Sequence, residues 1–257
     1  MRTDPIDKWV RGLVADTVVA DTRSPLLFWE SDFPVPGYGL PTTDVRMDLL
    51  VPTTSPPPTG FDFHEPHGPV SETYDLVLGD SRLPRAAWRR DDRALRDRIV
   101  LTWRPGTIDW WEEDEPVASH PRDPYKRVET LASSRHVVVS ADGTTLADSR
   151  SPVLLFETTL PTRFYLPESD LDLDRLVPSA ARSHCPYKGR ADRYWSVRDR
   201  PDLPDIAWSY TEPYPAVAAI AGRVAFYNEL LDITVDGRRQ VRAGSPFTSR
   251  DHRPGAG

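Results

Sequence analysis

Two of the three lysines in the chain occupy the same tripeptide, Pro-Tyr-Lys, a few residues after a histidine. They are Lys126 in "HPRDPYKRVE" and Lys188 in "HCPYKGRADRYWSV". Proline fixes φ before each Tyr-Lys pair, so each lysine is presented from a similar, stiffened turn. One hypothesis is that the two turns converge on one site between the domains. The two ammonium groups would then lie within about 15 Å of each other, because screened charges no longer couple beyond that distance. The alternative is chance, because Pro and Tyr are plentiful in this chain.

Lys188 is the first candidate for chemistry, and three interpretations of it stay open. Among Tyr187, Tyr194, Trp195 and Trp208 its ammonium would be desolvated, which lowers the pKa of a lysine towards that of a useful nucleophile or base. It could instead stay charged and bind a carboxylate or phosphate. In the structural alternative, its stem packs on aromatic rings while the charge meets water or Glu157.

Cys185 and His184 are adjacent, so in an extended chain their side chains point to opposite faces and form no thiolate–imidazole pair. Pro186 favours that extended conformation at Cys185. Cys185 is the only cysteine, which excludes an intramolecular disulfide and a zinc site built on several cysteines. A buried free cysteine usually acts as a small hydrophobe.

Two glutamates, Glu30 and Glu157, each end an apolar run, and a buried carboxylate needs a partner. Arg23 and Arg150 are the expected partners of these glutamates, with Arg163 as a further candidate. Because both glutamates recur with their arginines in a repeat described below, we interpret these as structural ion pairs.

A basic group of His120, Arg122, Lys126 and Arg127 follows the acidic run "EEDE". It is either a solvated linker with weak local ion pairs or the part of a composite anion site that Lys188 completes. The full candidate ligand-binding set consists of Lys188, Tyr187, His184, Cys185, Tyr194, Trp195, Lys126, Tyr125, Arg122 and His120. The histidines of "HEPHG", His64 and His67, lack a third ligand, so we expect a loop and no metal there.

Composition and charge limit the kinds of partner that we expect for this protein. The 257 residues carry a net charge of −7 and no basic run that could neutralise a line of phosphates, so we expect no nucleic-acid partner. No apolar run approaches the ~18 residues typical of a membrane helix, and the N-terminus has no apolar signal region. We expect a cytoplasmic protein with no cofactor and no membrane association. The excess of Arg over Lys indicates a GC-rich, bacterial genome.

An internal repeat organises the chain. "ADTRSPLLFWE" (20–30) matches "ADSRSPVLLFE" (147–157) without a gap, and the match continues through residues 33–52 and 160–178 with Gly39 as one extra residue. Two weaker sequence matches follow: Ile99 with Ile206, and "GTIDWWEE" (106–113) with "GRVAFYNE" (222–229). We therefore expect a first copy over residues 9–131 with a Pro-rich insertion at 53–70, a second copy over 134–247, and a disordered tail at 248–257.

The local patterns predict a mainly β fold of two small tandem domains built from sheets or barrels. β-branched residues flank Asp142-Gly143, a strong hairpin signal, and Ala15-Asp16 holds the matching place in the first copy. "PVLLFE" (152–157) and "DIAWSY" (205–210) are expected strands. Frequent prolines restrict helices to short turns, which we expect at 90–98 and 215–222.

The second copy resembles the domain-of-unknown-function family 427, most specifically in the stretch Cys-Pro-Tyr-Lys-Gly…Tyr-Trp from Cys185 to Trp195. "WWEEDEPVASHPRDPYKRVETLASSRHV" is similar to the junction in tandem members of that family. The resemblance implies a β-tent fold, similar in outline to methionine sulfoxide reductase B, which would make a redox role of Cys185 worth testing. It implies no activity. One classification groups the family with nucleotidyltransferases, but the chain has neither a Gly-rich phosphate loop nor a Gly-Ser pair followed by paired Asp.

Two functions remain open at this point. In the first, the second copy binds a small anionic or carbonyl-bearing metabolite near Lys188, with or without catalysis. In the second, the protein is a non-catalytic structural or interaction module with no small-molecule ligand. A ligand-free pocket around a buried Lys188 favours the first function, and a Lys188 already held by Glu157 or a backbone carbonyl, with no cavity, favours the second.

Overall fold

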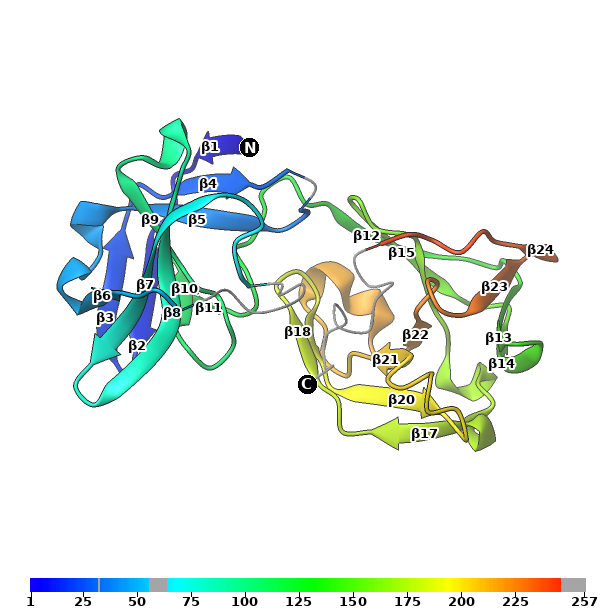
Figure 1. Cartoon of the computed structure of the whole chain (residues 1–257). Helices are drawn as coiled ribbons and strands as arrows, with labels where there is room; N and C mark the ends of the chain where they lie inside the picture. The colour runs from blue at the N-terminus through cyan, green and yellow to red at the C-terminus, as the bar shows by residue number, and fades with distance from the viewer. Residues whose placement is uncertain (32, 56–63, 246–257) are drawn as a thin grey trace. The chain divides into compact units, whose positions relative to one another are not determined.

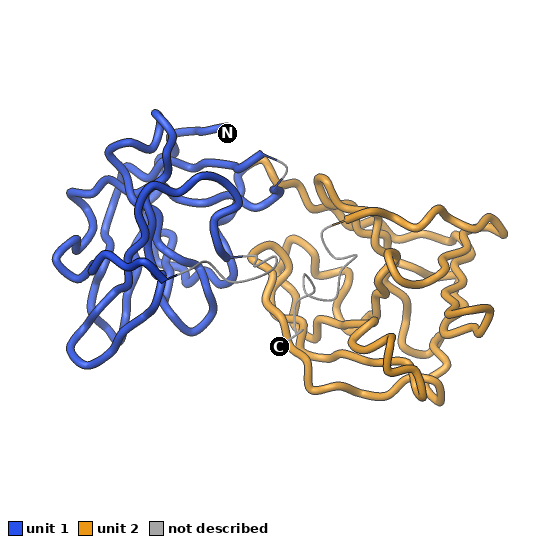
Figure 2. The backbone as a smooth tube through the Cα atoms, viewed as in Figure 1, with its two compact units in different colours: residues 1–124 blue, residues 125–257 orange. Residues whose placement is uncertain are grey.

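The computed structural model describes residues 1–31, 33–55 and 64–245. The chain divides into two compact units, residues 1–124 and 125–257 (Figure 2). The middle of the Pro-rich insertion, the end of the second copy at Phe247 and the tail at 248–257 lie outside the described residues. Each unit is mainly β, as the sequence predicts, and none of the sheets in the described residues closes into a barrel.

The first unit contains two antiparallel sheets (Figure 1). The larger has the strand order β1-β4-β5-β9-β8-β7-β6, and the smaller has the order β11-β10-β2-β3. The strands are β1 (Arg2–Pro5), β2 (Val10–Val14), β3 (Thr17–Thr22), β4 (Leu26–Trp29), β5 (Pro36–Pro41), β6 (Leu50–Pro52), β7 (Val70–Leu78), β8 (Ser81–Arg90), β9 (Arg98–Leu101), β10 (Asp109–Glu112) and β11 (Glu115–Val117).

The second unit repeats this arrangement in shorter pieces, with sheets ordered β12-β15-β16, β14-β13-β23-β24 and β17-β20-β21-β22, and the hairpin β18-β19. Its strands are β12 (Val128–Ala132), β13 (Val137–Ala141), β14 (Thr144–Ser149), β15 (Val153–Glu157), β16 (Arg163–Tyr165), β17 (Leu176–Ser179), β18 (Ser183–Cys185), β19 (Gly189–Ala191), β20 (Arg193–Val197), β21 (Ala207–Ser209), β22 (Val224–Phe226), β23 (Asp232–Val235) and β24 (Arg238–Arg239).

Strand β12 belongs to the second unit, although the sequence repeat predicts all but the last of its residues at the end of the first copy. It pairs along its whole length with β15, from Val128 opposite Glu157 to Ala132 opposite Val153. Strand β1 pairs with β4 in the same way in the first unit. The two edge strands share no residue pattern, so the similarity of sequence begins only after them.

The pairing registers identify which residues of the two units correspond. Trp88 lies opposite Thr73 and Val100, and Trp208 lies opposite Tyr194 and Ala225. The two tryptophans are therefore equivalent, and so are the residues two positions later, Arg90 and Tyr210.

The strand pairing contradicts the two weaker sequence matches between the copies. Val10 pairs with Glu112 and its counterpart Val137 pairs with Val235, so Glu112 corresponds to Val235. The match of residues 106–113 to 222–229 is wrong, because it sets β10 against β22, whereas the counterpart of β10 is β23. Leu40 pairs with Ile99 and its counterpart Leu166 bridges to Val224, so Ile99 corresponds to Val224 and not to Ile206.

Both predicted hairpins form. The turn residues Ala15 and Asp16 have φ of 45° and 66°, and Asp142 and Gly143 have φ of 46° and 82°. Two consecutive positive φ values are the mark of a type I′ turn, whose twist matches that of the flanking strands. The strands expected at 152–157 and 205–210 appear as β15 and β21.

The helical segments of the described residues are short 3₁₀ segments: η1 (Thr42–Asp44), η2 (Met47–Leu49), η3 (Arg93–Leu95), η4 (Glu168–Asp170), η5 (Leu173–Arg175) and η6 (Pro215–Ile220), the last of which is kinked at Val217. The turn predicted at 215–222 is confirmed. The one predicted at 90–98 is reduced to η3, because Arg90 ends β8 and Arg98 begins β9. No helix among the described residues has the length and apolar character needed to cross a membrane.

Two cores lie on opposite faces of β20 and β21 in the second unit, because successive strand residues point to opposite sides. Trp195, Ala207 and Phe226 belong to one core, and Tyr194, Trp208 and Ala225 belong to the other. The second of these, which also includes Tyr165 and Tyr210, is the tyrosine-rich face on which the candidate site is built.

Candidate functional site

Lys188 occupies a three-residue loop, 186–188, that joins β18 to β19. Its amide donates to the carbonyl of Cys185 at 3.3 Å, and its own carbonyl accepts from the amide of Tyr214 at 3.0 Å. Gly189 follows at φ +94°, a conformation that L side chains rarely adopt. The loop is thus held by one hydrogen bond across the turn and by a second to the segment that leads into η6.

The two faces of β18 are distinguished by their contacts. The hydroxyl of Ser183 hydrogen-bonds that of Tyr194 at 2.6 Å, whereas Nε2 of His184 meets the hydroxyl of Tyr214 at 3.1 Å. His184 and Cys185 therefore point to opposite sides, as the sequence predicts. Cys185 is half-buried and shares the face of Ser183 and Tyr194, two positions along the strand.

The two lysines meet at one carboxylate. Nζ of Lys188 lies 2.5 Å from Oε2 of Glu157, and Nζ of Lys126 lies 3.7 Å from Oε1. Only 6% of the Glu157 side chain is exposed, and 10–11% of each lysine side chain. The ammonium groups are well inside the 15 Å limit, but both lysines and the carboxylate belong to the second unit and not to a site between domains.

The expected arginine partners are wrong for both duplicated glutamates. Glu30 is buried against an arginine, but it is Arg90 at 2.6 Å, and Glu157 is held by lysines. Arg23 and Arg150 precede strands β4 and β15, whereas the glutamates come at their far ends, a distance of at least about 13 Å over four residues. Arg23 instead lies over the ring of Trp9 at 4.4 Å, and Arg150 is exposed.

Arg163 is a member of another buried pair. Its guanidinium donates to both oxygens of Glu229 at 2.7 Å, and 7% or less of either side chain is exposed. It also lies 5.5 Å from the ring of Trp208 and 5.6 Å from that of Tyr227. This pair closes one side of the tyrosine-rich face with its charges already satisfied.

The electrostatics keep Lys188 protonated. Burial acts to lower its pKa, but Cys185, Glu157 and Tyr165 more than reverse this, so the pKa lies above its ordinary value. Burial likewise opposes the charge of Glu157, yet Lys188 and Lys126 hold the pKa of that carboxyl below its ordinary value. The desolvated, low-pKa lysine considered from the sequence is therefore wrong in direction.

Two tyrosines that the candidate set omitted complete the arrangement. Burial raises the pKa of Tyr165 to about 12, and burial raises that of Tyr210 strongly. The hydroxyl of Tyr165 accepts a bond from Nε1 of Trp208 at 3.3 Å. That of Tyr210 has no hydrogen-bond partner among the described residues. The sequence repeat points to Tyr165, because this residue is aligned with Tyr38 of the first copy. It does not point to Tyr210, because the first unit has Arg90 at the corresponding position.

We call this arrangement the Lys188 cluster, and define it as Lys126, Glu157, Tyr165, Cys185, Lys188 and Tyr210. It contains more hydrogen-bond donors than acceptors. The ammonium of Lys188 has three N–H donors, and within the described part of the chain it donates to one acceptor, Glu157. The hydroxyl protons of Tyr165 and Tyr210 have no acceptor in the same residues. Such a set suits an oxygen atom that accepts several hydrogen bonds.

Other candidate residues lie outside the cluster. Trp195 packs in the opposite core, with Arg193 over its ring at 4.7 Å. Tyr187 is half-buried in the loop, and 54% of Tyr125 is exposed. His120 and Arg122 belong to the first unit, where Arg122 pairs with Glu115 at 2.7 Å.

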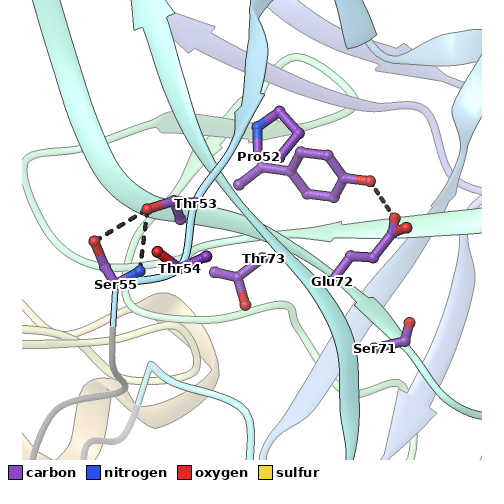
Figure 3. Close-up of a pocket in the computed structure, with 8 residues that line it drawn as sticks. Pro52, Thr53, Thr54, Ser55, Ser71, Glu72 and Thr73 are labelled. Carbon is purple, nitrogen blue, oxygen red and sulfur yellow. Dashed lines mark hydrogen bonds between the residues drawn. The ribbon is translucent and has the colours of Figure 1, made fainter.

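The described residues hold no group of three or more side chains placed to bind a metal ion. The amide of His67 donates to Glu30 at 2.6 Å, and its ring stacks on Phe33 with centroids 3.9 Å apart. An open groove of about 430 Å³ lies elsewhere in the first unit, between the end of β6 and β7 (Figure 3). It is lined mainly by hydroxyl side chains, from Thr53 to Ser55 and from Ser71 to Tyr74.

Comparison with known families accounts for both units. The model described as domain of unknown function (DUF427) matches residues 2–96 and again residues 129–237. The chain is a tandem member of this family. Its two matched segments fall in the two compact units, and the DUF427 description assigns no activity. No curated protein matches the chain.

Proposed function

We propose that the second DUF427 unit binds a small anionic or carbonyl-bearing metabolite at the Lys188 cluster. The observation that carries the proposal is the excess of donors over acceptors around a buried, protonated lysine. An oxygen-rich ligand would accept hydrogen bonds from Lys188 and from a tyrosine hydroxyl, which have more donor protons than the protein has acceptors for them.

The first unit supports this interpretation because it is an internal control. Its carboxylate, Glu30, is neutralised by Arg90, which also donates to the carbonyl of Gly68 at 3.0 Å. Tyr210 stands at the place of Arg90 in the second unit, and a lysine from a separate loop takes over the ion pair. A purely structural pair needs no such exchange of one arginine for two lysines and a tyrosine.

The tyrosines follow the same logic. In the first unit, Tyr38 donates to Oε1 of Glu112 at 2.8 Å. The counterpart of Glu112 is Val235, so the equivalent hydroxyl of Tyr165 has lost that carboxylate acceptor. The second unit therefore retains the donor and removes its protein acceptor, which leaves the hydroxyl available to a ligand.

The charge of Lys188 restricts what the site can do. A protonated ammonium cannot attack a carbonyl carbon, so a Schiff base with this lysine is disfavoured. It can hold the oxygen of a carboxylate, a phosphate or a polarised carbonyl by a charge-assisted hydrogen bond. We therefore propose that Lys188 binds and polarises the ligand, which we take to be a cytoplasmic metabolite.

A second candidate is a non-catalytic module in which the cluster only stabilises the fold. The contact of Lys188 with Glu157 at 2.5 Å favours this alternative. So does the position of the described groove, which lies in the first unit. The two candidates differ in whether a small molecule stabilises the protein through Lys188.

A thermal-shift screen of a metabolite library tests the proposal. We expect organic acids or oxo acids to raise the melting temperature of the wild type and to have no effect on Lys188→Met. Lys8→Met is the matched control, because Lys8 pairs with the buried Glu112 at 2.8 Å in the first unit; it should retain the ligand response. Absence of any shift in the wild type, or an equal shift in Lys188→Met, would support the structural module.

A further inference from the structure

The single cysteine of the chain lies at the entrance to the lysine loop. Cys185 ends β18, pairs with Gly189 across the hairpin and accepts the turn hydrogen bond from the amide of Lys188. Its side chain shares the strand face that carries Ser183, whose hydroxyl contacts Tyr194. The thiol is half-buried, and it is electrostatically coupled to Lys188, Tyr194 and Tyr210.

We infer that Cys185 is a nucleophile of the Lys188 cluster and that its electrophile is a small carboxylate-bearing carbonyl compound, the class of a 2-oxo acid. This inference rests on the proposed function, because Lys188 anchors the anionic end of the molecule. Cationic neighbours and partial exposure are the surroundings in which a cysteine is reactive, whereas an inert cysteine is buried among apolar groups.

The hydroxyl of Tyr210 is the independent observation that points to a ligand beside the thiol. Tyr210 is 3% exposed, and its hydroxyl has no hydrogen-bond partner in the described part of the chain. Its ring centroid lies 6.5 Å from that of Tyr165, whose hydroxyl proton has no acceptor there either. Tyr210 lies close enough to Cys185 to interact with it electrostatically, and a tyrosine hydroxyl in that place can donate to an alkoxide that develops at the nucleophile.

The step is a reversible addition that needs no oxidant or reductant. The sulfur of Cys185 forms a bond to the carbonyl carbon, the C=O π bond breaks, and its electron pair moves to the oxygen. The proton released by the thiol ends on that oxygen, and the product is a hemithioacetal or hemithioketal. Lys188 remains protonated and paired with the carboxylate of the bound molecule.

Alkylation rates test the inference with two reagents that differ only in charge. Iodoacetate carries a carboxylate and iodoacetamide does not, and both transfer a carbon to sulfur with loss of iodide. Since the chain has one cysteine, the extent of alkylation read by intact mass reports on Cys185 alone. The same protein unfolded in urea gives the ratio of the two rates for this cysteine without its site.

We expect the iodoacetate-to-iodoacetamide ratio in the native protein to exceed the unfolded ratio by about tenfold, because a fixed cation raises the local concentration of an anion. Lys188→Met should bring the native ratio back to the unfolded value, and Lys8→Met should not. Lys188→Met leaves Glu157 its contact with Lys126, so the carboxylate keeps a partner. Equal native and unfolded ratios in the wild type would overturn the inference.

The covalent step has its own readout. Glyoxylate labelled with ¹³C at the aldehyde carbon should give a new sp³ resonance with the wild type, and none with Cys185→Ser. A wild type that gives no such resonance overturns the covalent step. The two proposals can fail separately. If anions still raise the melting temperature of Cys185→Ser, but the iodoacetate-to-iodoacetamide ratio of the native wild type equals that of the unfolded protein, Lys188 binds anions and Cys185 is not the nucleophile. A native ratio that stays high in Lys188→Met refutes the anion anchor itself.

Discussion

At the scale of single residues, the glutamate that is duplicated in the repeat has a different charged partner in each unit. Glu30 and Glu157 end equivalent strands and both are buried. Arginine remains charged under all ordinary conditions, and its planar fork is suited to a fixed ion pair. Lysine is a point charge with three donors, and within the described residues Lys188 donates to Glu157 alone, whereas Arg90 also donates to the carbonyl of Gly68.

Removal of the Glu157 carboxylate tests the strength of the buried cluster. We expect Glu157→Ala to lower the free energy of unfolding by roughly 3–5 kcal/mol, because it leaves two buried ammonium groups without their shared anion. Denaturant titration measures the loss. Glu129→Ala is the control: its pair with Arg127 is 40% and 75% exposed, and a change of well under ~1 kcal/mol is expected. Equal midpoints for Glu157→Ala and the wild type would show that the cluster contributes nothing to stability.

The same carboxylate should make the second unit sensitive to acid. The pKa of Glu157 in the folded state lies below its ordinary value of 4.5, so the unfolded chain binds the proton more readily. The stabilisation from Glu157 is therefore present above about pH 4.5 and is lost as the pH falls below it. We expect the slope of stability against pH between pH 5 and pH 3, measured by urea titration, to be smaller in Glu157→Gln. An unchanged slope would assign the acid sensitivity to other carboxyls.

The sequence predicts some of these residue contacts and fails on others for geometric reasons. Burial of the two glutamates follows from their position after apolar runs, and the opposite orientation of His184 and Cys185 follows from strand alternation. The partners of the glutamates depend on which strands are neighbours. Arg90 and Lys188 come from segments 60 and 31 residues away along the chain, and no local pattern encodes that distance.

At the scale of elements, the two type I′ turns show that local signals are reliable where backbone geometry is demanding. Asp142-Gly143 and Ala15-Asp16 both adopt positive φ at two positions, a requirement that few residue pairs meet. The expected helix at 90–98 shows the opposite case. Its ends are drawn into β8 and β9, because pairing of those strands outweighs the helix propensity of a short segment.

The second position of each turn offers a reciprocal test. Asp16 has φ of 66° and carries a side chain in a conformation that suits glycine, whereas Gly143 at 82° is already optimal. We expect Asp16→Gly to raise the free energy of unfolding of the first unit by about 1 kcal/mol and Gly143→Ala to lower that of the second by a similar amount. Both are measured by denaturant titration. A loss of stability in Asp16→Gly would mean that the aspartate side chain makes a compensating contact.

At the scale of the whole molecule, the chain is two DUF427 units with separate cores. The apolar clusters around Val10 and Phe28 lie in the first unit, and those around Val137 and Val153 lie in the second. Each unit buries its own aromatic residues and forms its own sheets. The repeat predicts this organisation from sequence, because an ungapped match of eleven residues fixes equivalent strands in both copies.

Separate cores should give separate unfolding transitions. We expect differential scanning calorimetry to resolve two components, with Glu157→Ala lowering the melting temperature of one and Glu30→Ala that of the other. A destabilisation of about 3 kcal/mol corresponds to a shift of more than about 10 °C for a unit of this size. A single transition that both variants move together would show that the units unfold as one cooperative body.

The contact of Lys126 with Glu157 has a consequence for digestion by trypsin. Lys126 and Arg127 adjoin the boundary between the units, and trypsin must draw a basic side chain fully into its specificity pocket. Lys126 is 10% exposed and held on a buried carboxylate, whereas the side chain of Arg127 is 75% exposed. Of these two sites, Arg127 should therefore be cut first in the native protein, which leaves Arg127 at the end of the first fragment with Lys126 just before it. In Glu157→Gln the lysine loses its anion, and the bond that follows Lys126 should become a second early cut.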